Sequence, residues 1–113
     1  MSEVKTSYGT GVSRKMVRSR VDQMIAQFYK ILPMREDDST TLPAYLSSLQ
    51  REMLGMQSLM VEWGEDGEYL GLLGILEYHI QNPDCELSVV RSDVFKALSM
   101  IKRLHRKYDE ADK

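Results

Sequence analysis

Residues 87–108 read LSVVRSDVFKALSMIKRLHRKY and carry an apolar residue at every third or fourth position. The stripe consists of Leu87, Val90, Val94, Ala97, Ile101, Leu104 and Tyr108. Steps of three and four residues stay on one face of an α-helix. Residues 17–31, 42–63 and 69–80 show the same spacing. Each stripe needs a covering partner, so the sequence predicts an all-α fold, a small antiparallel up-down four-helix bundle.

The first two helices are bounded by capping residues and prolines. Ser13 is a suitable N-cap for a helix that we expect to end near residue 32, because Pro33 follows. Pro43 would lie in the first turn of the second helix, where a proline costs no helical hydrogen bond. We therefore expect the second helix to span about residues 42–63.

The sequence leaves two alternatives open, one for the start of the third helix and one for the start of the fourth. After a turn at residues 64–67, a helix with a stripe of Tyr69, Leu73, Leu76 and Ile80 is expected to reach about residue 81. The alternative is a β-hairpin, with residues 68–72 as its returning strand. The fourth helix begins either at Asn82 and Pro83, which form an N-cap and first-turn pair, or at Ser88.

Length and composition indicate one ordinary domain. The chain has 113 residues, of which 42% are hydrophobic and 28% are charged, with a formal net charge of −2. We predict a flexible N-terminal arm at residues 1–12, a bundle domain at 13–108 and a flexible tail at 109–113. No apolar run approaches the length of a membrane span, and the N-terminal residues lack the features of a signal peptide. Cys85 is the only cysteine, so a cytoplasmic protein without an internal disulfide is expected.

The second predicted helix has a wider apolar face than one neighbouring helix requires. Glycines on one side of the third helix would permit close approach of another helix, although core filling by methionines and a weak third helix are alternative explanations. We expect a non-enzymatic protein-interaction module, such as an adaptor, a chaperone-like module or an assembly subunit, which binds a protein partner or another copy of itself. The predicted interface residues are Tyr45, Leu54, Leu59, Val61, Trp63, Gly71 and Gly74.

Basic residues gather where the first helix begins and the fourth ends. In an up-down bundle these segments are adjacent, so they predict a basic patch at one end of the molecule. Phosphate contact with a nucleic acid is the alternative function, although the net charge of −2 argues against it and nearby acids could neutralise the patch. The candidate phosphate-binding residues are Arg14, Lys15, Arg18, Lys102, Arg103, Arg106 and Lys107.

Candidate catalytic residues are few. His79 and His105 lie on separate predicted helices, and His79 falls beside the packing face. Cys85 precedes a predicted helix start, but no basic partner is placed beside it by the sequence. The acidic residues 36–38 lack the spacing of a calcium loop. The sequence therefore predicts no enzyme, no metal, no cofactor and no small-molecule substrate.

Overall fold

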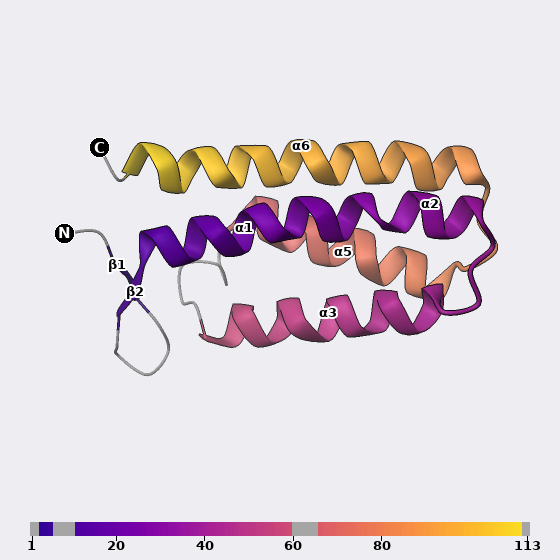
Figure 1. Ribbon diagram of the computed structural model, residues 1–113, viewed down its shortest axis with the longest axis horizontal. Helices are drawn as coiled ribbons and strands as arrows, with labels where there is room; N and C mark the ends of the chain where they lie inside the picture. The colour runs from indigo at the N-terminus through magenta and orange to yellow at the C-terminus, as the bar shows by residue number, and fades with distance from the viewer. Residues whose placement is uncertain (1–2, 6–10, 60–65, 112–113) are drawn as a thin grey trace.

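The computed structural model describes residues 3–5, 11–59 and 66–111, and the side chains of residues 18–57 and 66–106 (Figure 1). Within these described residues the elements are two short strands and five helical segments. In chain order they are β1 (Glu3–Lys5), β2 (Gly11–Ser13), α1 (Arg14–Tyr29), α2 (Ile31–Glu36), α3 (Leu42–Leu59), α5 (Gly67–Gln81) and α6 (Leu87–Ala111).

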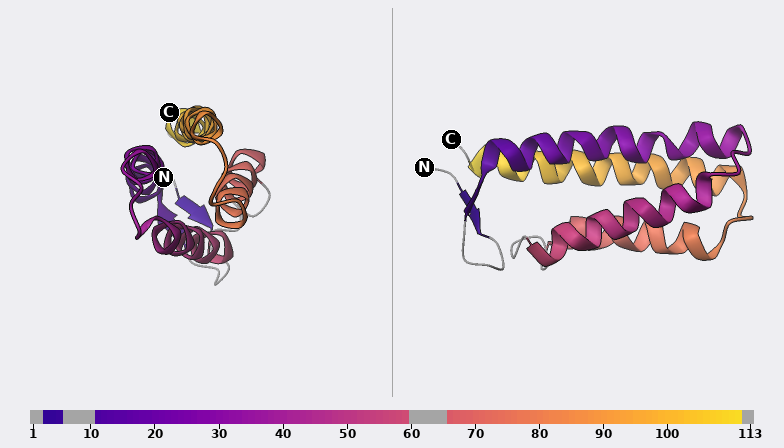
Figure 2. Two further views of the ribbon diagram at one scale, coloured as in Figure 1. Left: turned by 90° about the vertical axis from the view of Figure 1, so that its right-hand side faces the viewer. Right: turned by 60° about the horizontal axis from the view of Figure 1, so that its bottom comes forward.

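The helices form an antiparallel up-down bundle, which confirms the predicted fold class. In Figure 1, α1 and α2 run in one direction, α3 returns, α5 runs forward again and α6 returns beside α1 and α2. The views in Figure 2 show the helices arranged around a common interior, with α2 continuing the column that α1 begins. The first and last columns are adjacent, because α1 packs mainly against α6. No helix of the described part is long and apolar enough to cross a membrane.

The first helical column does not end where Pro33 predicted. The chain leaves regular helix at Lys30 alone and resumes as α2, with Pro33 in its first turn. Helical hydrogen bonds still flank the break, from Lys30 N–H to the Ala26 carbonyl at 3.1 Å and from Met34 N–H to the Lys30 carbonyl at 3.2 Å. Pro33 has no N–H to donate to the carbonyl four residues earlier, so it interrupts the helix without ending the column.

The end of α2 reverses the chain into α3. Asp38 has a φ of 51°, a left-handed conformation that aspartate tolerates better than most residues. Beside it, Ser39 N–H donates to the Met34 carbonyl at 2.9 Å, which closes the helix end. The predicted start of the next helix is confirmed, because α3 begins at Leu42 with Pro43 in its first turn.

The alternatives for the second half are also decided. Asp66 caps α5 by accepting hydrogen bonds from Glu68 N–H at 2.9 Å and Tyr69 N–H at 3.2 Å. Residues 68–72 are therefore helical, and the hairpin alternative was wrong. The fourth column begins at Leu87, one residue before the Ser88 alternative. Asn82 and Pro83 do not start the helix, because the chain turns at residues 82–86.

Both ends of the predicted domain carry regular structure beyond its boundaries. Residues Glu3–Lys5 and Gly11–Ser13 form an antiparallel ladder, with Val4 opposite Val12, inside the segment predicted as an arm. At the other end, α6 continues to Ala111, past the predicted limit at Tyr108.

The core is formed by the predicted apolar stripes, except that α5 is rotated about its axis relative to the prediction. On α6 all five stripe residues from Val90 to Leu104 are buried. On α5 the buried residues are Tyr69, Leu72, Leu76 and His79, whereas the predicted Leu73 and Ile80 are only partly buried. Since α5 is apolar on several sides, its sequence did not define the buried face, and packing against α3 and α6 turned the helix toward Leu72 and His79. This rotation buries a histidine.

Candidate functional site

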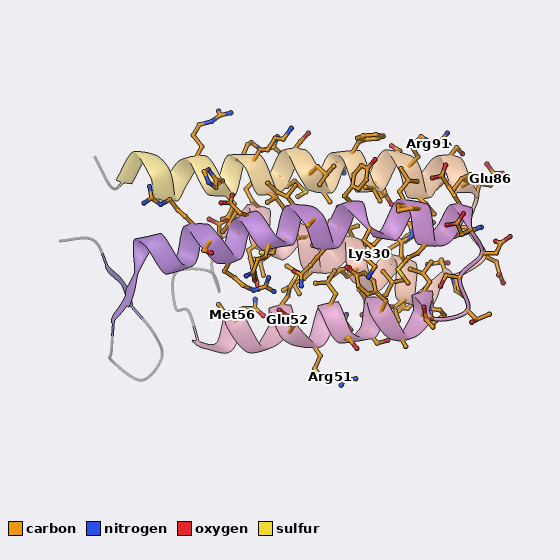
Figure 3. The ribbon with its side chains drawn as sticks, viewed as in Figure 1. Lys30, Arg51, Glu52, Met56, Glu86 and Arg91 are labelled. Atoms are coloured by element: carbon orange, nitrogen blue, oxygen red, sulfur yellow. The ribbon has the colours of Figure 1, made fainter. Side chains whose placement is uncertain are left out.

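The predicted interface on α3 and α5 is divided between the interior and the surface. Tyr45 is partly buried between α3 and α1, and its hydroxyl donates a hydrogen bond to the Gln27 carbonyl at 2.7 Å. The Lys30 ammonium lies 5.2 Å from its ring centroid, as Lys30 extends toward α3 (Figure 3). Burial, and secondarily the Glu52 carboxylate, raises the pKa of Tyr45. Tyr45 therefore joins α3 to α1 and is not part of an open docking face.

The two glycines of the predicted interface also have different surroundings. A Cβ atom on Gly71 would collide with the Met100 side chain, so this glycine permits the close approach of α6. At Gly74 the same atom would meet open space. Leu54 on α3 and Leu70 on α5 are both exposed, and Leu70 was missed in the sequence analysis. The side chains of Leu59, Val61 and Trp63 lie outside the described residues.

The basic end is partly neutralised, as the sequence predicted. Arg103 donates two hydrogen bonds to Glu68, from Nε at 3.0 Å and from Nη2 at 3.2 Å, and these bonds raise its pKa. Lys102 and Arg106 are exposed, and neither forms an ion pair with another described side chain. Arg18 is partly buried, and the side chains of Arg14, Lys15 and Lys107 lie outside the described part. Nucleic-acid binding at this end stays a prediction.

A second ion pair at the basic end joins α1 to α6. His105 Nε2 lies 3.2 Å from Asp22 Oδ1, and both side chains are open to solvent. At the other end of the same helix contact, Arg91 lies 3.6 Å from Glu36 of α2. Together the two pairs give the antiparallel register between the first and last helical columns.

Two exposed aromatic side chains lie along this register. Tyr29 is seven residues from both Asp22 and Glu36, so it shares their face toward α6. Phe95 is one helical turn from Arg91, and the register places it within about 5 Å of Tyr29 along the bundle axis. Tyr29 is 54% exposed and Phe95 is 53% exposed. Neither could be identified from the sequence, because the proximity of the two residues depends on the α1–α6 contact.

A pocket opens at the opposite end, between the α2–α3 connection and the turn at residues 82–86. Its volume is about 330 Å³. Apolar side chains from four helices contribute to its wall, namely Ile31, Met34, Leu42, Leu46, Ile80 and Val90. Its polar lining includes Arg35, Asp38, His79, Asp84 and Cys85.

Two of these polar side chains, His79 and Cys85, form a hydrogen-bonded series with Asp93, which does not line the pocket. Cys85 Sγ lies 3.5 Å from His79 Nδ1, and His79 Nε2 lies 2.8 Å from Asp93 Oδ2. His79 is on α5, Cys85 is in the turn and Asp93 is on α6, so the α5–turn–α6 hairpin assembles the series. His79 is buried, whereas Cys85 is partly open to the pocket. Thiol, imidazole and carboxylate in this order resemble the arrangement that activates cysteine nucleophiles.

Arg35 connects α2 to this turn. Its Nη2 donates to the Cys85 carbonyl at 2.9 Å, and its Nη1 lies 3.5 Å from Asp38 Oδ1. Its Nε is buried without a hydrogen-bond partner among the described residues. The guanidinium therefore holds the backbone of Cys85 against the end of α2.

The sequence alone placed no basic partner beside Cys85, whereas the fold brings His79 to it. The sequence contained one usable signal, the short spacing between His79 and Cys85 across Asn82 and Pro83, which favours a reversal of the chain. Asp93 lies on the next helix, α6, so its contact with His79 depends on how α5 and α6 pack. Among the described residues, no group of three or more histidine, cysteine or acidic side chains is arranged to hold a metal ion.

Comparisons with protein-family models, curated protein sequences and solved structures found no match to this chain.

Proposed function

We propose that this chain is a helical protein-interaction module, an assembly subunit that pairs with a second copy of itself across α1 and α6. The observation that carries the proposal is the exposure of Tyr29 and Phe95 on the neighbouring helices α1 and α6, at nearby levels along the bundle axis. Aromatic residues are the side chains most often found at the energetic centre of protein interfaces. Two exposed aromatic side chains near the middle of the α1–α6 contact suit contact with the same residues on another copy.

Charge favours a second copy in the antiparallel orientation. Lys102 is seven residues beyond Phe95 toward the basic end, and Glu36 is seven residues beyond Tyr29 toward the opposite end. A two-fold axis through the aromatic pair would therefore bring Lys102 and Arg106 of one copy opposite Glu36 and Asp37 of the other. All four side chains are exposed. Complementary charges on both sides of an apolar centre set the orientation of such a pair.

The predicted surface on α3 and α5 is the alternative position for the contact. Leu54 and Leu70 are exposed there, and Gly74 leaves space beside them. Leucine is less frequent than aromatic residues at the centres of interfaces. The network from Gln50 to Glu77 to Gln81 also runs between α3 and the exposed side of α5. We therefore place the contact at the aromatic pair.

The oligomeric state of selected variants tests the proposal. Sedimentation over a range of concentrations should show a dimer for the parent chain and a monomer for Phe95→Asp. Tyr78→Asp is the matched control, because Tyr78 is an exposed aromatic residue on α5. Helicity should be unchanged in both variants. A parent chain that stays monomeric at hundreds of micromolar would contradict the proposal. A dimer that dissociates with Leu54→Glu but not with Phe95→Asp would show that the interface lies on α3.

A charge exchange tests the orientation. Lys102→Glu should weaken the dimer by placing like charges opposite each other, and adding Asp37→Lys should restore it. The restoring effect should disappear at high salt, because exposed charges are screened.

A further inference from the structure

The series of Cys85, His79 and Asp93 has no role in the proposed pairing, which uses another face of the molecule. Asp93 determines which nitrogen of His79 faces the thiol. An ionised carboxylate only accepts hydrogen bonds, so a neutral His79 donates Nε2–H to Asp93 across 2.8 Å. Its Nδ1 then has a free lone pair, directed at Cys85 Sγ at 3.5 Å. The imidazole is thus arranged to receive the thiol proton.

The pocket provides space for a reaction partner at this thiol. Cys85 and His79 both line it, and Ile31, Leu46 and Val90 form part of its apolar wall. Its volume of about 330 Å³ is at the lower end of the range for small-molecule sites, which is roughly 300–1,000 Å³. Arg35 in the lining is paired with Asp38 at 3.5 Å, and Asp84 adds a further negative charge, so the lining disfavours an anionic group. The site therefore suits a short, uncharged, apolar acyl group.

We propose that Cys85 is a nucleophile that accepts a short acyl group from an activated ester or thioester, with His79 as its general base. Sγ bonds to the carbonyl carbon while the thiol proton passes to His79 Nδ1. The bond from the carbonyl carbon to the leaving oxygen or sulfur then breaks, and the proton passes from Nδ1 to the leaving atom. The products are a thioester on Cys85 and a free alcohol or thiol. The exchange needs no oxidant or reductant.

Two contacts position these groups. Asp93 orients the imidazole and stabilises the positive charge that His79 carries between the two proton transfers. Arg35 holds the Cys85 carbonyl, so the turn at residues 82–86 stays against the pocket. Figure 3 labels Glu86, the last residue of this turn, next to the start of α6.

The full-length protein and p-nitrophenyl butyrate test the proposal. The parent chain should release p-nitrophenolate and gain one butyryl group, located on Cys85 by peptide mass spectrometry, whereas Cys85→Ser should gain none. His79→Gln should acylate about 100-fold more slowly, as expected for loss of a general base. His105→Gln is the matched control, because His105 also pairs with an aspartate but has no cysteine beside it, and its rate should equal that of the parent.

Further variants separate chemistry from a structural effect. Added imidazole should partly restore the rate of His79→Ala, which a purely structural role would not allow. Asp93→Asn should change the pH–rate profile, and Asp22→Asn should not. If His79→Gln does not fold, the parent rate is compared with that of free cysteine at the same pH, and it should be higher. Equal rates for the parent and folded His79→Gln, acylation of lysine instead of Cys85, or a rate no higher than that of free cysteine would overturn the proposal.

Discussion

Each end of this bundle holds a histidine paired with an aspartate, and the two pairs differ in their surroundings. At the pocket end, His79 and Asp93 are 2.8 Å apart, with side chains that are 7% and 27% exposed. At the basic end, His105 and Asp22 are 3.2 Å apart, with side chains that are 34% and 61% exposed. Only His79 has a cysteine within hydrogen-bond distance among the described residues. The same two residue types thus form an enclosed series at one end and a solvated pair at the other.

The difference shows how burial changes the role of a polar contact. Water can replace either partner of the exposed pair, so the pair adds little to stability. Water has much less access to the ring of His79, because the side chain is buried except where it lines the pocket. Loss of a partner there leaves a buried polar group unsatisfied. Four predictions test this contrast between buried and exposed contacts, in order of decreasing effect.

The largest effect on stability is expected from the two aspartates. Asp93→Ala should lower the free energy of unfolding by about 1–3 kcal/mol, because His79 Nε2 loses its partner inside the bundle. Asp22→Ala removes an exposed pair and should cost about 0–1 kcal/mol. Urea unfolding at neutral pH measures both values. Equal losses would show that burial does not distinguish the two pairs.

A smaller effect is expected from the tyrosines that join α3 to its neighbours. Tyr69 is fully buried toward the basic end, and its hydroxyl donates to the Met53 carbonyl at 2.6 Å. Tyr69→Phe should lower the free energy of unfolding by about 0.5–1.5 kcal/mol at neutral pH. Tyr45→Phe should cost less, because Tyr45 is only partly buried near the pocket end.

The same tyrosines should make stability fall in alkaline solution. Burial is the main cause that raises the pKa of Tyr69 above the ordinary value of 10.0. Above about pH 10 the unfolded chain loses the phenolic proton while the folded chain keeps it, so the free energy of unfolding decreases as pH rises. Unfolding measured from neutral pH to about pH 11 should show a shallower decrease for Tyr69→Phe than for the parent. An unchanged slope would contradict the assignment.

The smallest effect on stability is expected at the basic end. Changing Arg14, Arg18, Arg103 and Arg106 to Gln should alter the unfolding free energy less than Asp93→Ala does, because Arg103 and Arg106 are solvent-exposed. If the patch contacts phosphates, the parent should bind nucleic acid at low salt, and the quadruple variant should bind more weakly with a flatter salt dependence. Absence of binding by the parent would leave the patch as a solvated surface.

Much of the fold could be predicted because it depends on local patterns. The stripes on α1, α3 and α6 predicted the buried faces, and Pro43 predicted the start of α3. Pro33 misled, since a proline in a first turn interrupts a helix without ending the column. The face of α5 could not be predicted, because Leu72 and Leu73 are equally apolar and only the neighbouring helices distinguish them.

The candidate site depended on information that no single helix contains. Three contacts between α5 and α6 share one antiparallel register: Glu68 with Arg103, Gly71 with Met100, and His79 with Asp93. The turn at residues 82–86 brings α6 back beside α5, but a shift of one helical turn between them would separate His79 from Asp93. The missing side chain at Gly71 permits the close approach, and the core side chains set the register.

The sequence by itself determined that this chain forms helices and which sides of three of them are buried, because apolar spacing and capping act within a few residues of each other. The tertiary structure alone decided the rotation of α5, its register with α6 and the exposure of Tyr29 and Phe95. These features arise from side chains on different helices that compete for the same volume, and interior packing has few solutions at a given helix distance. The contact of His79 with both Cys85 and Asp93 is a consequence of that packing.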